Sequence, residues 1–174
     1  MEKYDLNLIV EDVWKTCIKG GKEKQYVTKD DILIAVASYA TCKKEIDPEI
    51  QTSEVCRSLN PAYKGIVIIV KEDVEKGGDK NLMKFIILHE IGHLKCDHQY
   101  IDTVKTLEED IRREKEADYY AMERGGFSIS EALDIMETIH EKYIYHENED
   151  VRNFFKEKLK IRLQNIKEFK KSGT

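Results

Sequence analysis

The chain has 174 residues, of which 41% are hydrophobic and 36% charged, and its formal net charge is −5. This length and apolar content are enough for one globular domain with a buried core, and no apolar run approaches the roughly 18 residues of a membrane span. The acidic balance argues against a dedicated nucleic-acid-binding protein, because contacts to phosphates need a clustered positive field.

The N-terminus and the cysteines predict the cellular compartment. Acidic residues interrupt the N-terminal segment "MEKYDLNLIVEDVWK", where a signal peptide would carry an apolar block. The four cysteines are scattered without a CxxC pair, a pattern typical of free thiols in a reducing compartment. We therefore expect a cytoplasmic protein that does not associate with membranes.

The first 60 residues are predicted to be helical. Residues 3–19 place apolar side chains at helical spacing before a Gly-Gly pair, which favours a helix that stops there. Thr28 is expected to cap a second helix and Asp47 a third, with Pro48 at the first position of the third. We interpret residues 1–60 as a helical N-terminal scaffold.

Residues 61–174 are predicted to form a core of one strong strand and several helices. The run "GIVIIV" is short, continuous and β-branched, as in a buried strand, and "KQYV" (24–27) and "HQYI" (98–101) are its candidate partners. Periodicity and capping residues predict helices over about 80–97, 105–124, 128–143 and from 148 almost to the C-terminus. The expected fold is a single α+β domain over residues 1–174, predominantly helical, with a small sheet preceding the 80–97 helix.

The segment "HEIGH" in the 80–97 helix predicts a metal site. On a helix, His89 and His93 share one face, so both imidazoles can bind one Zn²⁺. Glu90 flanks that face and could take a proton from a zinc-bound water, whose pKa the metal lowers to about 7. The alternative is an amphipathic helix with two unrelated histidines. The apolar run before the motif indicates a buried helix, where unpaired histidines would be costly, and this favours the metal.

A third ligand is offered by "REKEADYYAM", about twenty residues further along. Glu114 and Asp118 are four residues apart, so Glu114 can complete a His₂Glu site while Asp118 hydrogen-bonds the outer nitrogen of a ligand histidine. Glu116 is the second choice as ligand, and a solvated charged helix face is the alternative for the whole segment. His98 is expected off the metal-facing side or beyond the helix end, because the HExxHxxGxxH pattern of a third histidine ligand is not matched.

The two motifs together resemble the gluzincins, in the form of the HtpX/Ste-type zinc peptidases and their soluble relatives, the minigluzincins. This resemblance implies a zincin-like fold with His89, His93 and Glu114 as zinc ligands, Glu90 as general base and Asp118 behind a ligand histidine. It covers about residues 66–160. The ImmA/IrrE regulatory peptidases, which also combine HExxH with a downstream E-x-E-A, are a second resemblance and imply the same metal chemistry.

A further segment of the resemblance is "HENEDVR", where His146 stands six residues before Arg152 as in the H-P-x-x-x-x-R segment of the HtpX-type enzymes. Glu147 replaces the proline, which puts the role of the segment in doubt. His146 is nevertheless a candidate catalytic residue. His146, Tyr143 or Tyr145 could donate a hydrogen bond to the oxyanion that forms during hydrolysis.

The expected function is zinc-dependent endopeptidase activity, in which Glu90 activates a zinc-bound water against a peptide or protein substrate. The substrate is expected to lie extended along a sheet edge, as the resemblance to zincins implies. The alternatives are a regulatory peptidase that cleaves one repressor protein, an inactive zinc-bound interaction module, and a DNA-binding regulator that uses "EIQTSEVCRSLN" as part of a helix-turn-helix. The oligomeric state does not follow from the sequence.

Overall fold

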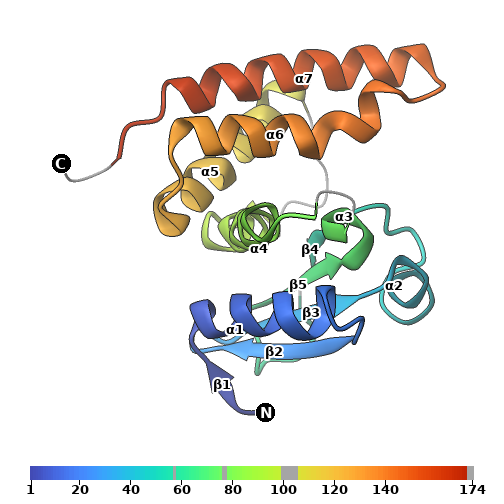
Figure 1. Cartoon of the computed structure of the whole chain (residues 1–174), viewed down its shortest axis with the longest axis vertical. Coiled ribbons are helices and arrows are strands. Elements are labelled where there is room, and N and C mark those ends of the chain that lie inside the picture. The colour runs from blue at the N-terminus through green and yellow to red at the C-terminus, as the bar shows by residue number, and fades with distance from the viewer. Residues whose placement is uncertain (57, 76–77, 99–105, 172–174) are drawn as a thin grey trace.

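The computed structural model describes residues 1–56, 58–75, 78–98 and 106–171, and its elements form three layers (Figure 1). A five-stranded sheet forms the base, α4 lies across the middle, and a hairpin of α6 and α7 lies on the side of α4 away from the sheet. The strands are β1 (Lys3–Tyr4), β2 (Lys24–Thr28), β3 (Ile32–Ala37), β4 (Glu54–Cys56) and β5 (Gly65–Val70).

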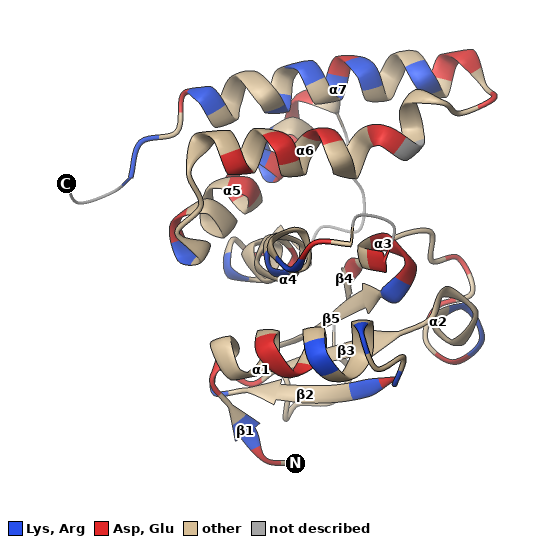
Figure 2. Ribbon diagram, viewed as in Figure 1, with Lys and Arg blue, Asp and Glu red and all other residues tan. Residues whose placement is uncertain are grey.

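The helices account for most of the remaining described residues. They are α1 (Leu6–Asp12), the π-helix η1 (Val13–Ile18), α2 (Tyr39–Glu45), α3 (Lys71–Glu75), α4 (Lys80–Lys95), α5 (Leu107–Gly125), α6 (Ile129–Ile144) and α7 (Glu149–Lys167). Figure 2 shows basic and acidic residues interspersed along α7, whereas β3 and β5 carry almost none. Within the described part of the chain, no helix combines the length and the apolar character needed to cross a membrane.

The sheet has the strand order β1-β2-β3-β5-β4. β5 pairs in parallel with β3 on one side and antiparallel with β4 on the other, so it is an interior strand. Among the described residues, β4 forms the edge of the sheet on the side of α4 and contacts that helix. The prediction of a strand at "GIVIIV" is confirmed. "KQYV" is also a strand of the same sheet and forms most of β2, but it pairs with β1 and β3 and not with β5 as predicted.

Two of the predicted N-terminal helices are wrong. Thr28 does not cap a helix, because Ile32–Ala37 forms β3 and the Thr28 hydroxyl accepts a hydrogen bond from the Ile32 amide in a turn between strands. Asp47 heads a short turn instead of a helix, and Glu54–Cys56 further on forms β4. The run "ILIAVA" is apolar on both sides because it is covered on both faces, and such a run fits a buried strand as well as a helix.

With these corrections, residues 1–60 contain strands as well as helices. The segment expected to be a helical scaffold, residues 1–60, contributes four of the five strands, although its first predicted helix is confirmed as α1 followed by η1. "EIQTSEVCRSLN" contains a strand and no helix among its described residues, so it does not form a helix-turn-helix. The division of the domain at residue 60 stays a prediction. Of "HQYI", residues 99–101 lie outside the described part of the chain.

The four helices predicted after the strand are confirmed, and their ends follow from local chemistry. Asp79, Ser128 and Asn148 cap the N-termini of α4, α6 and α7 with side-chain oxygens, and Glu131 completes a capping box with Ser128. Gly126 ends α5 in the left-handed conformation with φ of 68°, which glycine adopts without steric cost. These helices carry the predicted site residues, so their positions fix its geometry.

α4 is the central helix of the fold. From Leu82 to Gly92 every residue except Lys84 is buried, because the helix packs against the sheet on one side and against α5 on another. A helix that is apolar nearly all round is typical of such an interior position. His89 and Glu90 are therefore held inside the protein on a rigid element, with little freedom to move.

Gly92, inside the "HEIGH" segment, allows α4 and α5 to approach closely. A Cβ atom at this position would lie 3.0 Å from the Cα and 3.1 Å from the carbonyl oxygen of Ala117, and 3.1 Å from the Cβ of Tyr120. A methyl group would therefore have to push the two helices apart by a few tenths of an ångström. Because the predicted ligands are divided between these helices, their spacing sets the geometry of the site.

Gly92→Ala tests this constraint. In an open helix the substitution would raise stability by about 1 kcal/mol, whereas crowding of α5 is expected to reverse the sign and lower the free energy of unfolding by about 1–3 kcal/mol. Urea denaturation of the wild type, Gly92→Ala and the exposed control Lys95→Ala measures the difference. A Gly92→Ala protein as stable as its helix propensity predicts would contradict the close approach of α4 and α5 at this position.

Candidate metal centre

The two histidines of "HEIGH" lie one helical turn apart and point in the same direction, as predicted. Their Nε2 atoms are 3.1 Å from one another, and their rings meet edge to face. Both side chains are largely buried. Two imidazole nitrogens directed at one point inside a protein require a shared partner or a shared proton.

Glu114 approaches the same point from α5. Its carboxylate oxygens lie 3.6 Å from Nε2 of His89 and 3.7 Å from Nε2 of His93. One donor atom from each of the three residues lies within 4.8 Å of the others, so the group could hold a metal ion. Two imidazole nitrogens and one carboxylate oxygen match the donor set of catalytic zinc sites, which leave a further position open. The residues therefore fit the predicted metal.

Asp118 supports one of the histidines from behind. Its Oδ1 lies 2.9 Å from Nδ1 of His89, and its carboxylate is 1% exposed. When His89 is neutral, as a metal ligand must be, a carboxylate at this distance favours its hydrogen on Nδ1 and would leave the lone pair of Nε2 directed toward Glu114 and His93. This is the position that the sequence predicts for Asp118.

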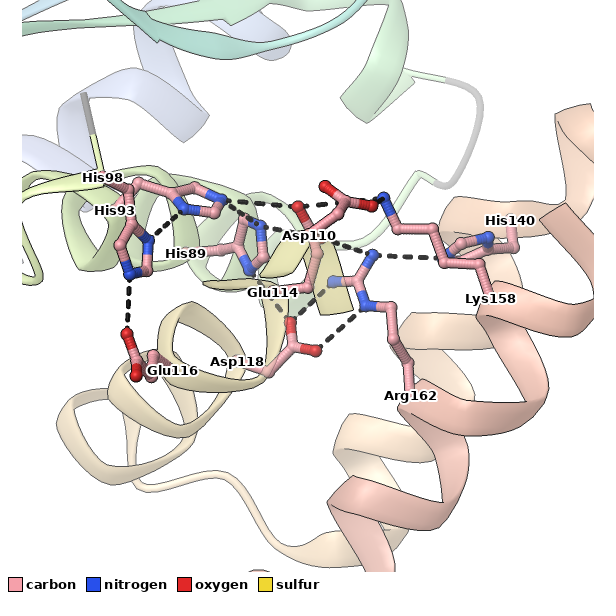
Figure 3. A network of polar contacts seen from close by, with 10 residues as sticks. All are labelled: His89, His93, His98, Asp110, Glu114, Glu116, Asp118, His140, Lys158 and Arg162. Atoms are coloured by element: carbon pink, nitrogen blue, oxygen red, sulfur yellow. Dashed lines mark hydrogen bonds and ion pairs between the residues drawn. The ribbon is translucent and has the colours of Figure 1, made fainter. Parts of the chain in front are cut away.

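Arg162 of α7 binds both acids of α5 (Figure 3). Its guanidinium donates to both oxygens of Asp118, over 3.0 and 2.7 Å, and lies 2.9 Å from a carboxylate oxygen of Glu114. It also donates to Nε2 of His140, on α6, over 3.1 Å. All four side chains are buried or nearly so, and a bidentate arginine–carboxylate pair of this kind is strong and geometrically specific.

Lys158, one turn before Arg162, adds a second positive charge. Its ammonium lies 2.8 Å from Asp110 and 3.9 Å from the other oxygen of Glu114. In Figure 3, Lys158 and Arg162 reach the acids from the side of α7, opposite to His98 and Glu116. The two oxygens of Glu114 therefore each face a cation of α7 as well as a histidine of α4.

The electrostatic consequence is that both acids are ionised. Burial acts most strongly and would raise both pKa values, but Arg162 and His89 together, joined by Lys158 and His93 at Glu114, outweigh it and lower the pKa of Glu114 and of Asp118. Burial and the neighbouring His89 lower the pKa of His93 to about 3, which keeps that imidazole neutral with a free lone pair. A neutral imidazole and an ionised carboxylate are the forms that bind metal ions.

Glu90 lies next to the ligands, but no metal cluster includes it among the described residues. Its carboxyl group is buried and, with the ligands, lines a cavity of about 920 Å³. Burial, together with the negative charges of Glu114 and Glu54, raises the pKa of Glu90 to about 8. A group that accepts and releases protons near neutral pH is thereby placed beside the candidate ligands.

The cavity lies between the edge of the sheet at β4 and the hairpin of α6 and α7. Residues 51–55, which include the first part of β4, line one side, and side chains of α4 and α5 line the floor. The opposite side is formed by residues of α6 and α7 and by Tyr145. Its size falls in the range of binding pockets, and it opens directly onto the His₂Glu cluster.

The other candidates from the sequence lie elsewhere. His146 is exposed, does not line the cavity, and accepts a hydrogen bond from the Asn148 amide at the start of α7. Arg152 donates to the carbonyl oxygens of His146 and Glu147, which ties the loop to α7. Tyr143 and Tyr145, by contrast, line the cavity. The structure therefore brings the two tyrosines to the site and leaves His146 outside it.

Glu116, the second choice as third ligand, does not join the cluster with His89 and His93. It lies on the other side of His93, 2.7 Å from Nε2 of His98. The sequence patterns do not predict a role for Arg162, His140 or Lys158. One signal was present: two buried acids, predicted as Glu114 and Asp118, require a buried cation, and the apolar face of the last helix carries Arg162 between Leu159 and Leu163.

The family model of Peptidase U49 matches residues 81–132. The match extends from the first turn of α4 through α5 to the start of α6, and it includes the histidines of "HEIGH" as well as Glu114 and Asp118. It covers under a third of the chain and indicates similarity to a peptidase family. No curated protein and no solved structure matches the chain significantly.

Arg162→Met is expected to lower the free energy of unfolding by about 3–5 kcal/mol, because it leaves Glu114 and Asp118 buried without their cation. Arg152→Met, the matched change ten residues earlier in α7, is expected to cost less than about 1 kcal/mol, since its two carbonyl partners lie near the surface. Chemical denaturation of the metal-free proteins measures both. Equal losses for the two variants would show that Arg162 has no special structural role.

The buried His140 is expected to make the stability of the protein depend on pH. Burial, then the charges of Arg162 and Lys158, lower its pKa to about 4, although the nearby Glu114 and Asp118 act in the opposite direction. Below about pH 6.5 the unfolded chain binds a proton that the folded protein does not bind until about pH 4, so acid lowers stability by up to about 1.4 kcal/mol per pH unit in this interval.

The variant His140→Gln, which cannot take up that proton, isolates the effect. Between pH 7 and pH 5 the metal-free wild type is expected to lose about 2 kcal/mol more of its unfolding free energy than His140→Gln does. Denaturation curves at both pH values measure the difference. If the two proteins lose the same amount of stability, His140 is not held neutral by its surroundings.

Proposed function

We propose that the chain is a zinc-dependent endopeptidase that hydrolyses peptide bonds in a peptide or protein substrate. The observation that carries this proposal is the convergence of His89, His93 and Glu114 at one wall of a large cavity, with Glu90 beside them. The similarity of residues 81–132 to a peptidase family supports the same reaction. His89, His93 and Glu114 would hold the metal, and Asp118 would orient His89.

When bound, a divalent zinc ion supplies a Lewis acid that polarises a carbonyl group and lowers the pKa of water. Glu90 provides the proton-transfer group. Its carboxylate would take a proton from the attacking water and return that proton to the leaving amine. It lies next to His89 on α4, so helical geometry fixes its position relative to the ligands.

An extended substrate would bind along β4. This strand is the sheet edge nearest to α4, and residues 51–55 line the same cavity as the ligands. A strand added to this edge would gain main-chain hydrogen bonds independent of sequence. The edge is firmly held: Ser53 donates to Asp73 through its amide (2.7 Å) and its hydroxyl (2.9 Å), and the hydroxyl accepts from the Val70 amide.

The oxyanion requires a hydrogen-bond donor on the opposite wall of the cavity. Tyr143 lines that wall, stacked on Phe155 at 3.8 Å between ring centroids, and Tyr145 lines it as well. This supports the tyrosines over His146 as donors. His140, whose Nε2 is held by Arg162, lines the same wall but already accepts a hydrogen bond from that residue.

Glu90→Gln tests the proposed reaction. Zinc-loaded wild type and Glu90→Gln are expected to hold one zinc ion each, because Glu90 is not a proposed ligand. Cleavage of casein by the variant is expected to fall at least about 100-fold, since Gln cannot accept a proton. Metal content by plasma mass spectrometry and release of labelled peptides measure the two properties. Glu137→Gln, the same change at an exposed site on α6, is the matched control and should cleave like the wild type.

Two outcomes would change the proposal. If the wild type binds zinc but neither protein cleaves casein or a peptide library, a strictly selective regulatory peptidase of the ImmA/IrrE type or an inactive zinc-bound module is favoured. If the wild type binds no zinc or other divalent metal under loading conditions, the proposed function is wrong.

A further inference from the structure

His98 connects the ligand His93 to a carboxylate on α5. Nδ1 of His98 lies 2.8 Å from Nδ1 of His93, and its other nitrogen, Nε2, lies 2.7 Å from a carboxylate oxygen of Glu116 (Figure 3). The second oxygen of Glu116 accepts a hydrogen bond from Arg112 over 2.7 Å. His98 is 7% exposed, so its own two contacts are largely shielded from water, whereas the side chain of Glu116 is 38% exposed and meets Arg112 at the surface.

The turn that ends α4 explains how His98 reaches this place. α4 ends at Lys95, and Asp97 adopts a positive φ of 58°, which reverses the direction of the chain. His98 is therefore beyond the helix end, as the sequence predicts, but it is folded back against the outer face of His93 five residues earlier. A continued helix would have carried it away from that ring.

The N–H hydrogen of each ring can be assigned by matching every donor to an acceptor within reach. A neutral His93 that directs the lone pair of Nε2 toward His89 and Glu114 must carry its hydrogen on Nδ1, and that hydrogen needs an acceptor. Nδ1 of His98 is the group within reach, so it must be unprotonated. The hydrogen of His98 is then on Nε2, where the carboxylate of Glu116 accepts it. Nδ1 of His93, both nitrogens of His98 and both oxygens of Glu116 then each have a hydrogen-bond partner.

We propose that His98 and Glu116 are positioning residues that orient His93 and keep its hydrogen on Nδ1, so that Nε2 is preset to bind the metal. The inference rests on the proposed function, because it assumes that His93 is a ligand. Each candidate ligand histidine is then backed by a carboxylate of α5: His89 directly by Asp118, and His93 by Glu116 through the His98 ring. Groups behind metal-bound histidines typically change metal affinity 10–100-fold.

A second metal site is the competing interpretation of the same residues. Cys96, His98 and Glu116 offer donor atoms that lie within 4.8 Å of one another. A metal on Nε2 of His98 would move the hydrogen of that ring to Nδ1. Two N–H groups, from His93 and His98, would then face each other over 2.8 Å, which is repulsive. Occupation of this cluster is therefore incompatible with a neutral His93 ligand, and the hydrogen-bonded chain is favoured.

The zinc affinity of four full-length proteins tests the proposal: wild type, His98→Ala, His98→Asn and Cys96→Ser. Titration against a chromogenic chelator is expected to show zinc binding that is 10–100-fold weaker for His98→Ala. His98→Asn is expected to recover part of the loss, because its amide oxygen can accept from Nδ1 of His93 although it cannot reach Glu116. Cys96→Ser should match the wild type, with one zinc per chain in both.

Tautomers in the wild type provide a readout that does not depend on any variant folding. Two-bond ¹H–¹⁵N spectra of the zinc-loaded, ¹⁵N-histidine-labelled protein should show His93 protonated on Nδ1 and His98 protonated on Nε2. The opposite tautomer at His98 would overturn the proposal, as would wild-type zinc affinity in a folded His98→Ala protein. Two zinc ions per chain, one of them lost in Cys96→Ser, would establish the second metal site instead.

The proposed function and this inference fail in different ways. If the wild type binds zinc and cleaves casein while His98→Ala does both equally well, the positioning role is wrong and the peptidase stands. If the wild type binds no zinc, the peptidase proposal is wrong and the positioning role falls with it.

Discussion

The buried contact of Arg162 with Glu114 and Asp118 is the interaction on which the candidate site depends. Two carboxylates inside a protein are tolerated only when charges and hydrogen bonds compensate for lost hydration, and without them they would take up protons. An acid that took up a proton could neither bind a metal as Glu114 is proposed to do nor hold the tautomer of His89. Arg162 thus contributes most among the groups that keep both acids of α5 in the form the site requires.

Because the site depends on Arg162, the hairpin of α6 and α7 is part of the site and does more than shield it from solvent. α7 supplies the cations, α6 supplies His140, and both helices form the far wall of the cavity. α4 and α5 hold the donor atoms, and Gly92 sets the distance between these two helices. Contacts from all four helices therefore hold the donor atoms of His89, His93 and Glu114 close together before any metal binds. Little reorganisation is needed when a metal binds.

The sheet contributes on the other side of the cavity. β5 lies between β3 and β4 in the sheet, and α4 packs directly on β5. This packing keeps α4 buried. β4 leaves its outer edge free among the described strands, next to the ligands. A rigid cluster on one wall and an unpaired strand edge on the next are the two features that a protein acting on extended peptides needs, which is why the site and the sheet support the same function.

The sequence by itself determined what depends on neighbours three or four residues away. Helical periodicity predicts that His89 and His93 share one face of α4 and that Glu114 and Asp118 share one face of α5. Local hydrogen bonding predicts the capped ends of the later helices. The sequence did not separate strand from helix in "ILIAVA", because a run covered on both faces carries no period. Only the tertiary structure decided that Arg162, 44 residues after Asp118, is the partner of both acids, and that His98 turns back onto His93. Such contacts depend on how helices and turns meet in space. A charged residue on an apolar helix face indicates burial, as at Arg162, but its spacing along the chain does not say which residues it meets.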